Sequence, residues 1–359
     1  MRIGTIYSAS DRALNDALNQ KTVTNADLRE LFLSRGILVS KESSRKTLAL
    51  YFSRLGHDYR DYQRLAKLFG SQAHRERMAG TRIATEVALT TFESSAYELK
   101  AKLEQSGAIV KVYSAQGTRL DIEVKYSKVQ FNKSEFRQVV NRTAVISVQR
   151  EGEDLVIYAP HNEEVSEWIH ELRNSASEKS GETLEFDDIE LPPTLSQSEK
   201  SSFFTELIKA IPGYQLHDVS DVYVSKPKRE SDDDDDGDQN GSPGTHISKA
   251  SLRGQGVLQS QELKLLGAQK FYISRIIWVA KPLEPGSDLH EFEAQFSSPE
   301  ECTDFTFLPR GFYKSLEGPG YSQTRTGFSS EEEKKLGRMI EAAARATLDK
   351  ILEAGDVAK

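Results

Sequence analysis

The chain has 359 residues, of which 37% are apolar and 28% are charged, a composition that is typical of globular proteins and excludes a chain that is disordered throughout. Its length is about two to three times that of a common domain, so we expect two or three domains, each with its own core. The sequence contains no run of roughly 18 apolar residues, which predicts no membrane span.

Further features bound the functional class. Residues 1–6 lack the long apolar core of a secretory signal, and we therefore expect a cytoplasmic protein. Cys302 is the only cysteine, which excludes an internal disulfide and a cysteine-based zinc site. The seven histidines show no metal-ligand spacing, and neither a phosphate-binding glycine loop nor a nucleophile elbow is present. We expect no metal or cofactor, and binding is favoured over catalysis.

Charge is distributed unevenly along the chain. Residues 1–150 hold 25 Lys and Arg against 15 Asp and Glu, whereas residues 151–359 hold 22 against 40. The five aspartates at 232–236 supply part of the acidic excess. A basic front and an acidic remainder are expected when the front contacts a polyanion, so we predict a nucleic-acid partner for the first part of the chain.

Two short amphipathic helices are predicted at residues 25–35 and 43–55. Asn25 is a favourable helix N-cap, and Gly36 favours a left-handed stop after Arg35. Between the helices, the apolar segment 37–39 predicts a short extended piece, and Ser43 or Ser44 caps the second helix. The apolar residues at helical spacing are Leu28, Leu31, Phe32, Leu48, Tyr51, Phe52 and Leu55.

The segment 25–55 resembles the helix-extension-helix nucleic-acid-binding modules of the SAP type. The resemblance rests on Asp-Leu-Arg-Glu-Leu at 27–31, Ser-Arg-Gly-Ile at 34–37 and the serine- and lysine-rich link before the second helix. In such modules, basic residues around the start of the second helix contact DNA phosphates. The resemblance implies this role for Lys41, Arg45 and Lys46, with Arg35 and Arg54 in support. The modules usually carry a glycine in the link, and residues 41–44 contain none.

The residues also predict a phosphate site on physical grounds. Ser43, Ser44 and the free backbone amides of a helix start form an anion site, beside which Arg45 and Lys46 place two positive charges. Such a site binds phosphate without reading the base sequence. The alternative interpretation is a small winged-helix or helical-hairpin domain that contacts a protein and carries ordinary surface cations.

A third helix is predicted at 59–69, with Arg60 and Arg64 on its polar side, where they extend the basic surface. Tyr59 and Tyr62 on the other side either stack on the bases of a single strand or, as is more common at helical spacing, pack in a core. Residues 1–79 therefore predict a basic helical nucleic-acid-binding domain. Its expected contact residues are Arg35, Lys41, Ser43, Ser44, Arg45, Lys46, Arg54, Arg60 and Arg64.

Residues 80–176 predict an α+β domain with a helix at about 85–105, β-hairpins at 108–129 and 144–159, and a closing helix at 163–173. On the strand 119–129, Asp121, Glu123 and Lys125 resemble the PD-(D/E)xK metal-dependent nucleases. This resemblance implies carboxylates that hold Mg²⁺ and a lysine that activates a water molecule, with Glu98 as an extra ligand.

The spacing departs from the nuclease pattern, in which the first acid precedes the second by many residues. The three side chains also alternate strictly with Leu120, Ile122, Val124 and Tyr126, as in any half-solvated strand. A Mg²⁺-dependent nuclease therefore remains an alternative to a strand without catalytic groups.

Residues 177–198 are polar and contain Pro192 and Pro193, which predicts a linker. Residues 199–359 predict a further α+β domain that begins with a helix at 199–210 and closes with a helix at 330–353. The acidic segment 228–246 is expected to be a disordered loop. A strand at 289–296 alternates Leu289, Glu291, Glu293 and Gln295 with His290, Phe292, Ala294 and Phe296.

Aromatic and basic residues alternate in the glycine-rich segment 310–325. Phe312, Tyr313 and Tyr321 lie near Arg310, Lys314 and Arg325 in the sequence. Such interleaving is typical of a ligand or nucleic-acid contact, and ordinary loop packing is the alternative.

The sequence as a whole predicts an α+β protein: a small N-terminal helical (helix-extension-helix) domain followed by two α+β units with antiparallel sheets. The two units share an order of elements, which suggests a duplication. We expect a nucleic-acid-binding accessory protein, with DNA as the nucleic acid, whose α+β body engages a protein partner, a ligand or a second copy. Analogy with phage-defence and DNA-maintenance operons suggests a bacterial antiviral-defence role. A non-catalytic protein-binding scaffold is the second alternative.

Overall fold

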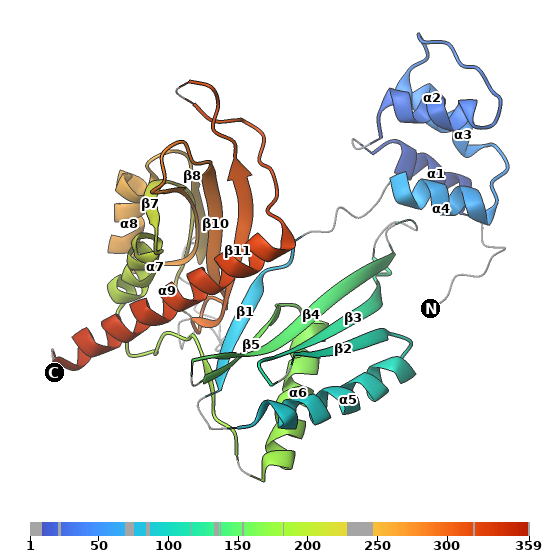
Figure 1. Cartoon of the computed structure of the whole chain (residues 1–359). Helices are drawn as coiled ribbons and strands as arrows, with labels where there is room; N and C mark the ends of the chain where they lie inside the picture. The colour runs from blue at the N-terminus through green and yellow to red at the C-terminus, as the bar shows by residue number, and fades with distance from the viewer. Residues whose placement is uncertain are drawn as a thin grey trace, which may run out of the picture. The chain divides into compact units, whose positions relative to one another are not determined.

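The computed structural model describes residues 9–20, 23–68, 75–83, 87–115, 117–132, 136, 138–152, 154–181, 183–227, 247–318 and 320–357. Helices and an antiparallel sheet make up the described chain, so the expected α+β class is confirmed (Figure 1). The chain forms two compact units, of which the first comprises Met1–His74, Lys100–Lys111 and Glu123–Ala144. The second comprises Arg75–Leu99, Val112–Ile122 and Val145–Lys359. The acidic segment 228–246 lies outside the described residues.

The first unit contains the N-terminal helices α1 (Asp11–Leu18), α2 (Asn25–Leu33), α3 (Arg45–Ser53) and α4 (Tyr59–Leu68). Their apolar faces bury a common core that includes Leu14, Leu28, Phe32, Phe52 and Leu65. Side chains cap the first three helices, because Ser10, Thr24 and Ser44 each accept a hydrogen bond from an amide in the first turn. Thr24, rather than the expected Asn25, caps α2 and forms a reciprocal capping box with Asp27.

Tyr62 on α4 belongs to this core. Its side chain is 9% exposed, and its ring stacks on Phe136 with a centroid separation of 4.9 Å. Of the two roles considered for Tyr62, the structure therefore shows core packing. Tyr59 is half-buried and stacks on Tyr62 at 6.2 Å.

An antiparallel sheet extends through both of the α+β regions that the sequence predicts. Its strands follow the order β2-β3-β4-β5-β1-β11-β10-β9-β7-β8. The first five strands are β1 (Met78–Ile83), β2 (Ile109–Ala115), β3 (Arg119–Val129), β4 (Val139–Glu151) and β5 (Asp154–Pro160). The others in this order are β7 (Tyr214–Ser225), β8 (Lys249–Arg253), β9 (Tyr272–Pro282), β10 (Leu289–Ser298) and β11 (Thr303–Tyr313).

Strand β1 joins the two halves of the sheet. It pairs with β5 over six residues, from Met78↔Pro160 to Ile83↔Leu155, and meets β11 at Met78↔Phe307. The domain boundary expected at residues 79 and 80 therefore falls inside a strand at the middle of the sheet.

The predicted linker 177–198 is largely structured. Helix α6 (Glu163–Ser180) continues through the expected boundary and ends where Gly181 adopts a φ of +74°. The short strand β6 (Phe186–Asp188) then pairs with β1, and Ile189, Leu191 and Leu195 are buried. Three paired residues are too few to give a period-two pattern, which is why composition alone indicated a linker.

Helices cover the sheet (Figure 1). Helices α5 (Leu89–Gln105) and α6 accompany β2 to β5, whereas α7 (Gln197–Ala210) and α9 (Ser330–Val357) pack on β7, β9 and β11. The core of the latter layer contains Phe203, Phe204, Trp278, Phe292 and Phe296. Helix α8 (Gln261–Ala268) follows the one-turn helix Val257–Gln259. Among the described helices, none has both the length and the apolar character needed to cross a bilayer.

Candidate nucleic-acid interface

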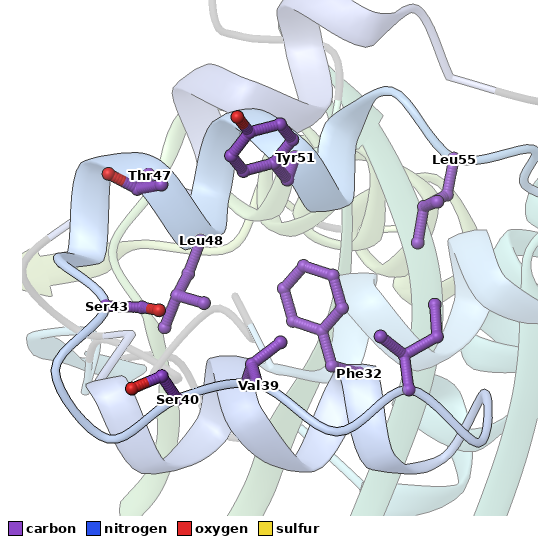
Figure 2. Close-up of a pocket in the computed structure, with 9 residues that line it drawn as sticks. Phe32, Val39, Ser40, Ser43, Thr47, Leu48, Tyr51 and Leu55 are labelled. Atoms are coloured by element: carbon purple, nitrogen blue, oxygen red, sulfur yellow. The ribbon is translucent and has the colours of Figure 1, made fainter.

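The helix-link-helix segment α2–α3 encloses a shallow hollow of about 370 Å³ (Figure 2). Gly36 has a φ of +72° and turns the chain out of α2, as its position in the sequence predicts. Residues 37–40 have no regular secondary structure and pair with no described strand, so the link is a loop. Phe32, Val39, Leu48 and Leu55 form the apolar wall of the hollow, and Ser40, Ser43 and Thr47 form its polar rim.

Exposed apolar side chains occur on α2, on α3 and on the link between them. Leu38 is 86% exposed, and Leu33 and Tyr51 are each 59% exposed. The periodic pattern places Tyr51 on the buried face of α3, but its ring lies at the mouth of the hollow (Figure 2). Apolar side chains in this number on a small helical unit are typical of a contact surface.

Ser44, not Ser43, caps α3. The hydroxyl Oγ of Ser44 accepts a hydrogen bond from the amide of Thr47 at 3.2 Å, whereas Ser43 faces the hollow. One serine hydroxyl of the predicted anion site therefore already accepts a hydrogen bond from the backbone. The cap does not occupy the remaining first-turn amides, which carry the partial positive charge of the helix N-terminus.

Arg35 is held by internal contacts. Its Nη1 donates to the carbonyl of Gly56 at 2.6 Å, and its Nη2 lies 2.5 Å from Oδ2 of Asp61 and 2.9 Å from Nδ1 of His57. His57 Nε2 lies 2.9 Å from the carbonyl of Phe52, so Nε2 donates there and Nδ1 accepts from Arg35. Arg35 is predicted to bind phosphate, but in the structure its side chain links the end of α2 to the α3–α4 turn.

The side chain of Arg45 also makes a contact within the helical bundle. Its guanidinium is half-buried, and Nη2 donates to the carbonyl of Leu18 at the end of α1 at 3.4 Å. Arg29 makes a related contact, because its Nη2 donates to the carbonyl of Lys41 at 2.6 Å and so holds the link. This contact uses the backbone carbonyl of Lys41, and the side chain of Lys41 is exposed.

The remaining predicted cations are exposed. Lys41 and Lys46 flank the start of α3, Arg54 is its C-terminal cap, and Arg60 and Arg64 lie one turn apart on α4. Among the described residues, no ion pair involves the side chains of Lys41, Lys46, Arg54 or Arg64. The backbone amide of Asp61 is the largest influence lowering the pKa of Asp58, and the charges of Arg60 and Arg35 add to it. The structure thus leaves five of the nine predicted residues exposed and uses Arg35, Ser44 and Arg45 in internal contacts, whereas Ser43 faces the hollow.

The three residues of the nuclease prediction have partners in the sheet. Asp121 accepts from Arg119 Nε at 2.9 Å and from the Ser147 hydroxyl at 2.6 Å. Glu123 pairs with Lys125 Nζ at 3.3 Å. Glu98 on α5 instead contacts α6, where it pairs with Lys179 at 2.9 Å, and this contact lowers the pKa of Glu98.

Within the described part of the chain, no group of three or more His, Cys, Asp or Glu side chains is arranged to hold a metal ion. The nuclease interpretation stays a prediction. Cys302 is buried, and desolvation raises the pKa of its thiol, which opposes a nucleophilic role.

Comparison with known proteins gives no family assignment. No protein-family model and no curated protein sequence matches this chain. The function therefore has to be argued from the geometry of the molecule itself.

The sequence prediction missed the exposed apolar side chains of the link between α2 and α3. Ile37, Leu38 and Val39 are consecutive in an extended link, and consecutive side chains of an extended chain point to opposite sides. At least one of them therefore had to face away from the bundle. This geometric signal predicts an exposed apolar side chain in the link without selecting its position, and the structure shows Leu38 as the most exposed of the three.

Proposed function

We propose that this protein is a nucleic-acid-binding accessory protein whose N-terminal helices contact the phosphate backbone, with DNA as the nucleic acid and the cytoplasm as the location. The proposal rests mainly on one observation: Lys41 and Lys46 flank the start of α3, are exposed, and form no ion pair with the described residues. Exposed cations beside a helix N-terminus bind phosphate oxygens through both charge and backbone amides. The α+β body is proposed to engage a protein partner or a ligand.

The contact set proposed here is narrower than the set predicted from the sequence. Arg35 and Arg45 donate to groups within the helical bundle, so they position the helices. Arg54, Arg60 and Arg64 are exposed and add positive charge to the same unit. Backbone contacts of this kind give affinity without base specificity.

The test is a salt titration of the full-length chain. Fluorescence anisotropy with labelled duplex and single-stranded DNA gives the binding constant as a function of salt concentration. The double variant Lys41→Ala/Lys46→Ala is expected to bind all sequences more weakly and to reduce the slope of log K against log salt by about one to two units.

Lys334→Ala/Lys335→Ala is the matched control, because both lysines are exposed near the start of α9 and the charge change is the same. The control is expected to keep the wild-type slope. Equal slopes for the Lys41/Lys46 variant and wild type, or no binding by wild type at low salt, would refute the proposal.

A second candidate function, a non-catalytic protein-binding scaffold, is favoured by the exposed apolar side chains of α2, α3 and their link. Leu38 at 86% exposure and Tyr51 at 59% exposure provide anchors of the kind that helical grooves offer to an apolar partner segment. A second copy is the partner that is simplest to test. Analytical ultracentrifugation is expected to show self-association that Leu38→Ser abolishes, and a monomer at all concentrations contradicts this form of the candidate.

A further inference from the structure

Two buried glutamates on β10 are separated by one residue and therefore lie on the same face of the sheet. This face is opposite the aromatic core. Glu291 is 6% exposed and Glu293 is 2% exposed, whereas Phe292 between them belongs to the core under α7 and α9. A carboxylate is costly to bury without compensating charges and hydrogen bonds. The alternation of residues along the predicted strand 289–296 does not indicate that these two carboxylates are buried.

Four arginines from separate parts of the second unit surround the two carboxylates. Glu293 Oε1 lies 2.6 Å from Nη2 of Arg77 and 2.9 Å from Nε of Arg275, and its Oε2 lies 3.2 Å from Nη1 of Arg310. Glu291 Oε2 lies 3.0 Å from Nε of Arg310 and also pairs with Nη1 of Arg325. The Tyr313 hydroxyl donates to Glu291 Oε1 at 3.0 Å. We call Arg77, Arg275, Arg310 and Arg325 the arginine cluster.

The backbone is shaped to bring these arginines together. The register of β10 against β11 shifts between Glu291 and Phe292, which makes Arg310 the extra residue of a β-bulge. A bulge re-aims a side chain, here toward both glutamates. Gly311, with a φ of +141°, lets the return segment approach, because a Cβ there would collide with the carbonyl of Thr326 and crowd Arg325. Phe312 and Thr326 exchange hydrogen bonds of 2.8 Å that fix this segment.

The positive charge of the arginine cluster exceeds the negative charge of the two glutamates. Four guanidinium groups and two carboxylates leave a net charge of two positive units. The four arginine side chains are between 24% and 36% exposed, so the cluster reaches the surface. Arg275 also lies over the Tyr223 ring at 4.5 Å, and no described residue accepts a hydrogen bond from its terminal nitrogens. Fixed guanidinium groups with free donors match phosphate oxygens.

We propose that the arginine cluster binds a compact phosphate dianion, such as the phosphate or pyrophosphate group of a small soluble ligand. Purely structural pairing of two glutamates needs two arginines, whereas the surplus of two charges matches a dianion. A long polyanion is disfavoured, because residues 151–359, which contain three of the four arginines, hold 22 basic against 40 acidic residues. The site is independent of the N-terminal interface.

Isothermal titration of the full-length chain with inorganic pyrophosphate tests the proposal. Wild type is expected to bind, and its melting temperature is expected to rise with pyrophosphate but not with sodium chloride at equal ionic strength. Arg275→Gln/Arg325→Gln leaves Arg77 and Arg310 to neutralise both glutamates, so the fold is retained. Affinity for pyrophosphate is expected to fall at least about tenfold, because charge-assisted hydrogen bonds are lost.

The matched control is Lys264→Gln/Lys350→Gln, which removes two exposed positive charges from α8 and α9 outside the cluster. The control is expected to bind as wild type does. No binding by wild type, or equal affinity in the Arg275/Arg325 variant, overturns the proposal without affecting the N-terminal interface. If Arg275→Gln/Arg325→Gln fails to fold, the single variant Arg325→Gln replaces it, and an affinity for pyrophosphate equal to that of wild type overturns the proposal.

A second arm separates a small ligand from nucleic acid. The Lys41→Ala/Lys46→Ala background removes the contacts proposed for the N-terminal interface, and a single-stranded oligonucleotide is added to the pyrophosphate complex. Retained pyrophosphate binding supports a small phosphorylated ligand. If the oligonucleotide displaces pyrophosphate at low concentration, the ligand is not a small phosphorylated molecule. The cluster is then assigned to a phosphodiester strand.

Discussion

At the scale of single residues, His290 shows how burial sets a pH response. Its ring lies 4.9 Å from the Phe328 ring, and its Nδ1 lies 2.8 Å from the Tyr214 hydroxyl. Burial lowers the pKa of His290, and the nearby charges of Asp288 and Glu332 oppose this shift only in part. A neutral imidazole is therefore favoured in the folded protein.

The stability that depends on His290 is fully present above the unfolded-state pKa of about 6.5 and is lost as the pH falls toward the lowered folded-state pKa. Below about pH 6.5 the unfolded chain takes up a proton that the folded chain resists. We expect the wild-type melting temperature to fall between pH 7 and pH 5, and His290→Gln to make this fall shallower. Thermal melts monitored by circular dichroism across this range measure the slope.

His170→Gln is the matched control, because His170 is exposed on α6. It is expected to leave the slope unchanged. An identical slope in wild type and His290→Gln would mean that other groups carry the acid sensitivity. Gln keeps a hydrogen-bond acceptor for Tyr214, so the comparison isolates the loss of the titrating ring.

At the scale of elements, local signals predicted α2, α3 and α4 but not α1, and they predicted contacts poorly. The capping serine and apolar spacing placed α3 correctly, because both signals lie within about ten residues of the chain. The arginine cluster was not predictable in this way, since Arg77 and Glu293 are 216 residues apart in sequence and meet only through the pairing of the sheet. The interleaving of Arg310, Tyr313 and Arg325 in the sequence indicates a contact surface. No local pattern identifies Glu291 as their buried partner.

Ser44 provides a prediction at the element scale. Ser44→Ala removes the acceptor for the Thr47 amide and is expected to destabilise α3 locally by about 1 kcal/mol. Hydrogen-exchange mass spectrometry on the full-length chain is expected to show about fivefold faster exchange in peptides covering 44–53 when exchange follows local opening. Ser43→Ala is the matched control and is expected to change little, because Ser43 faces the hollow. Equal effects of the two variants would contradict the assignment of the cap.

At the scale of the whole second unit, α9 fastens the two halves of the sheet. Gly337 on α9 packs against Phe307 of β11, where an added Cβ would lie 3.0 Å from the ring. Glu341 and Arg345 lie about one and two turns further along α9, and this buried ion pair reaches the other half. Arg345 donates to the Asp187 carboxylate at 2.6 Å, and the Tyr158 hydroxyl donates to Glu341 at 3.2 Å.

Tyr158 remains a donor at any ordinary pH. Burial is the largest cause that raises its pKa, and the negative charges of Glu341 and Glu151 raise it further. Gly80 lets α9 approach β1, because an added Cβ would lie 2.9 Å from Cγ of Glu341. The sequence did not predict this polar contact, since Glu341 and Arg345 resemble an ordinary surface ion pair one turn apart.

Arg345→Met is therefore expected to destabilise the second unit by about 3–5 kcal/mol, because Glu341 is left buried without its countercharge. It is also expected to uncouple the two halves of the sheet. Trp168 on α6 and Trp278 on β9 report on one half each, so Trp168→Phe and Trp278→Phe provide single-tryptophan backgrounds. Urea unfolding followed by fluorescence is expected to give coincident midpoints for the two reporters with Arg345 present and separate midpoints with Arg345→Met.

Arg338→Met is the matched control on the same helix. Arg338 donates to Gln149 at 2.6 Å from a side chain that is 41% exposed, so its removal leaves no buried charge and is expected to cost less than about 1 kcal/mol. The double variant Glu341→Gln/Arg345→Met is expected to recover part of the stability, because it removes both charges of the pair. Coincident midpoints in Arg345→Met would show that strand pairing between β1 and β11 couples the halves without α9.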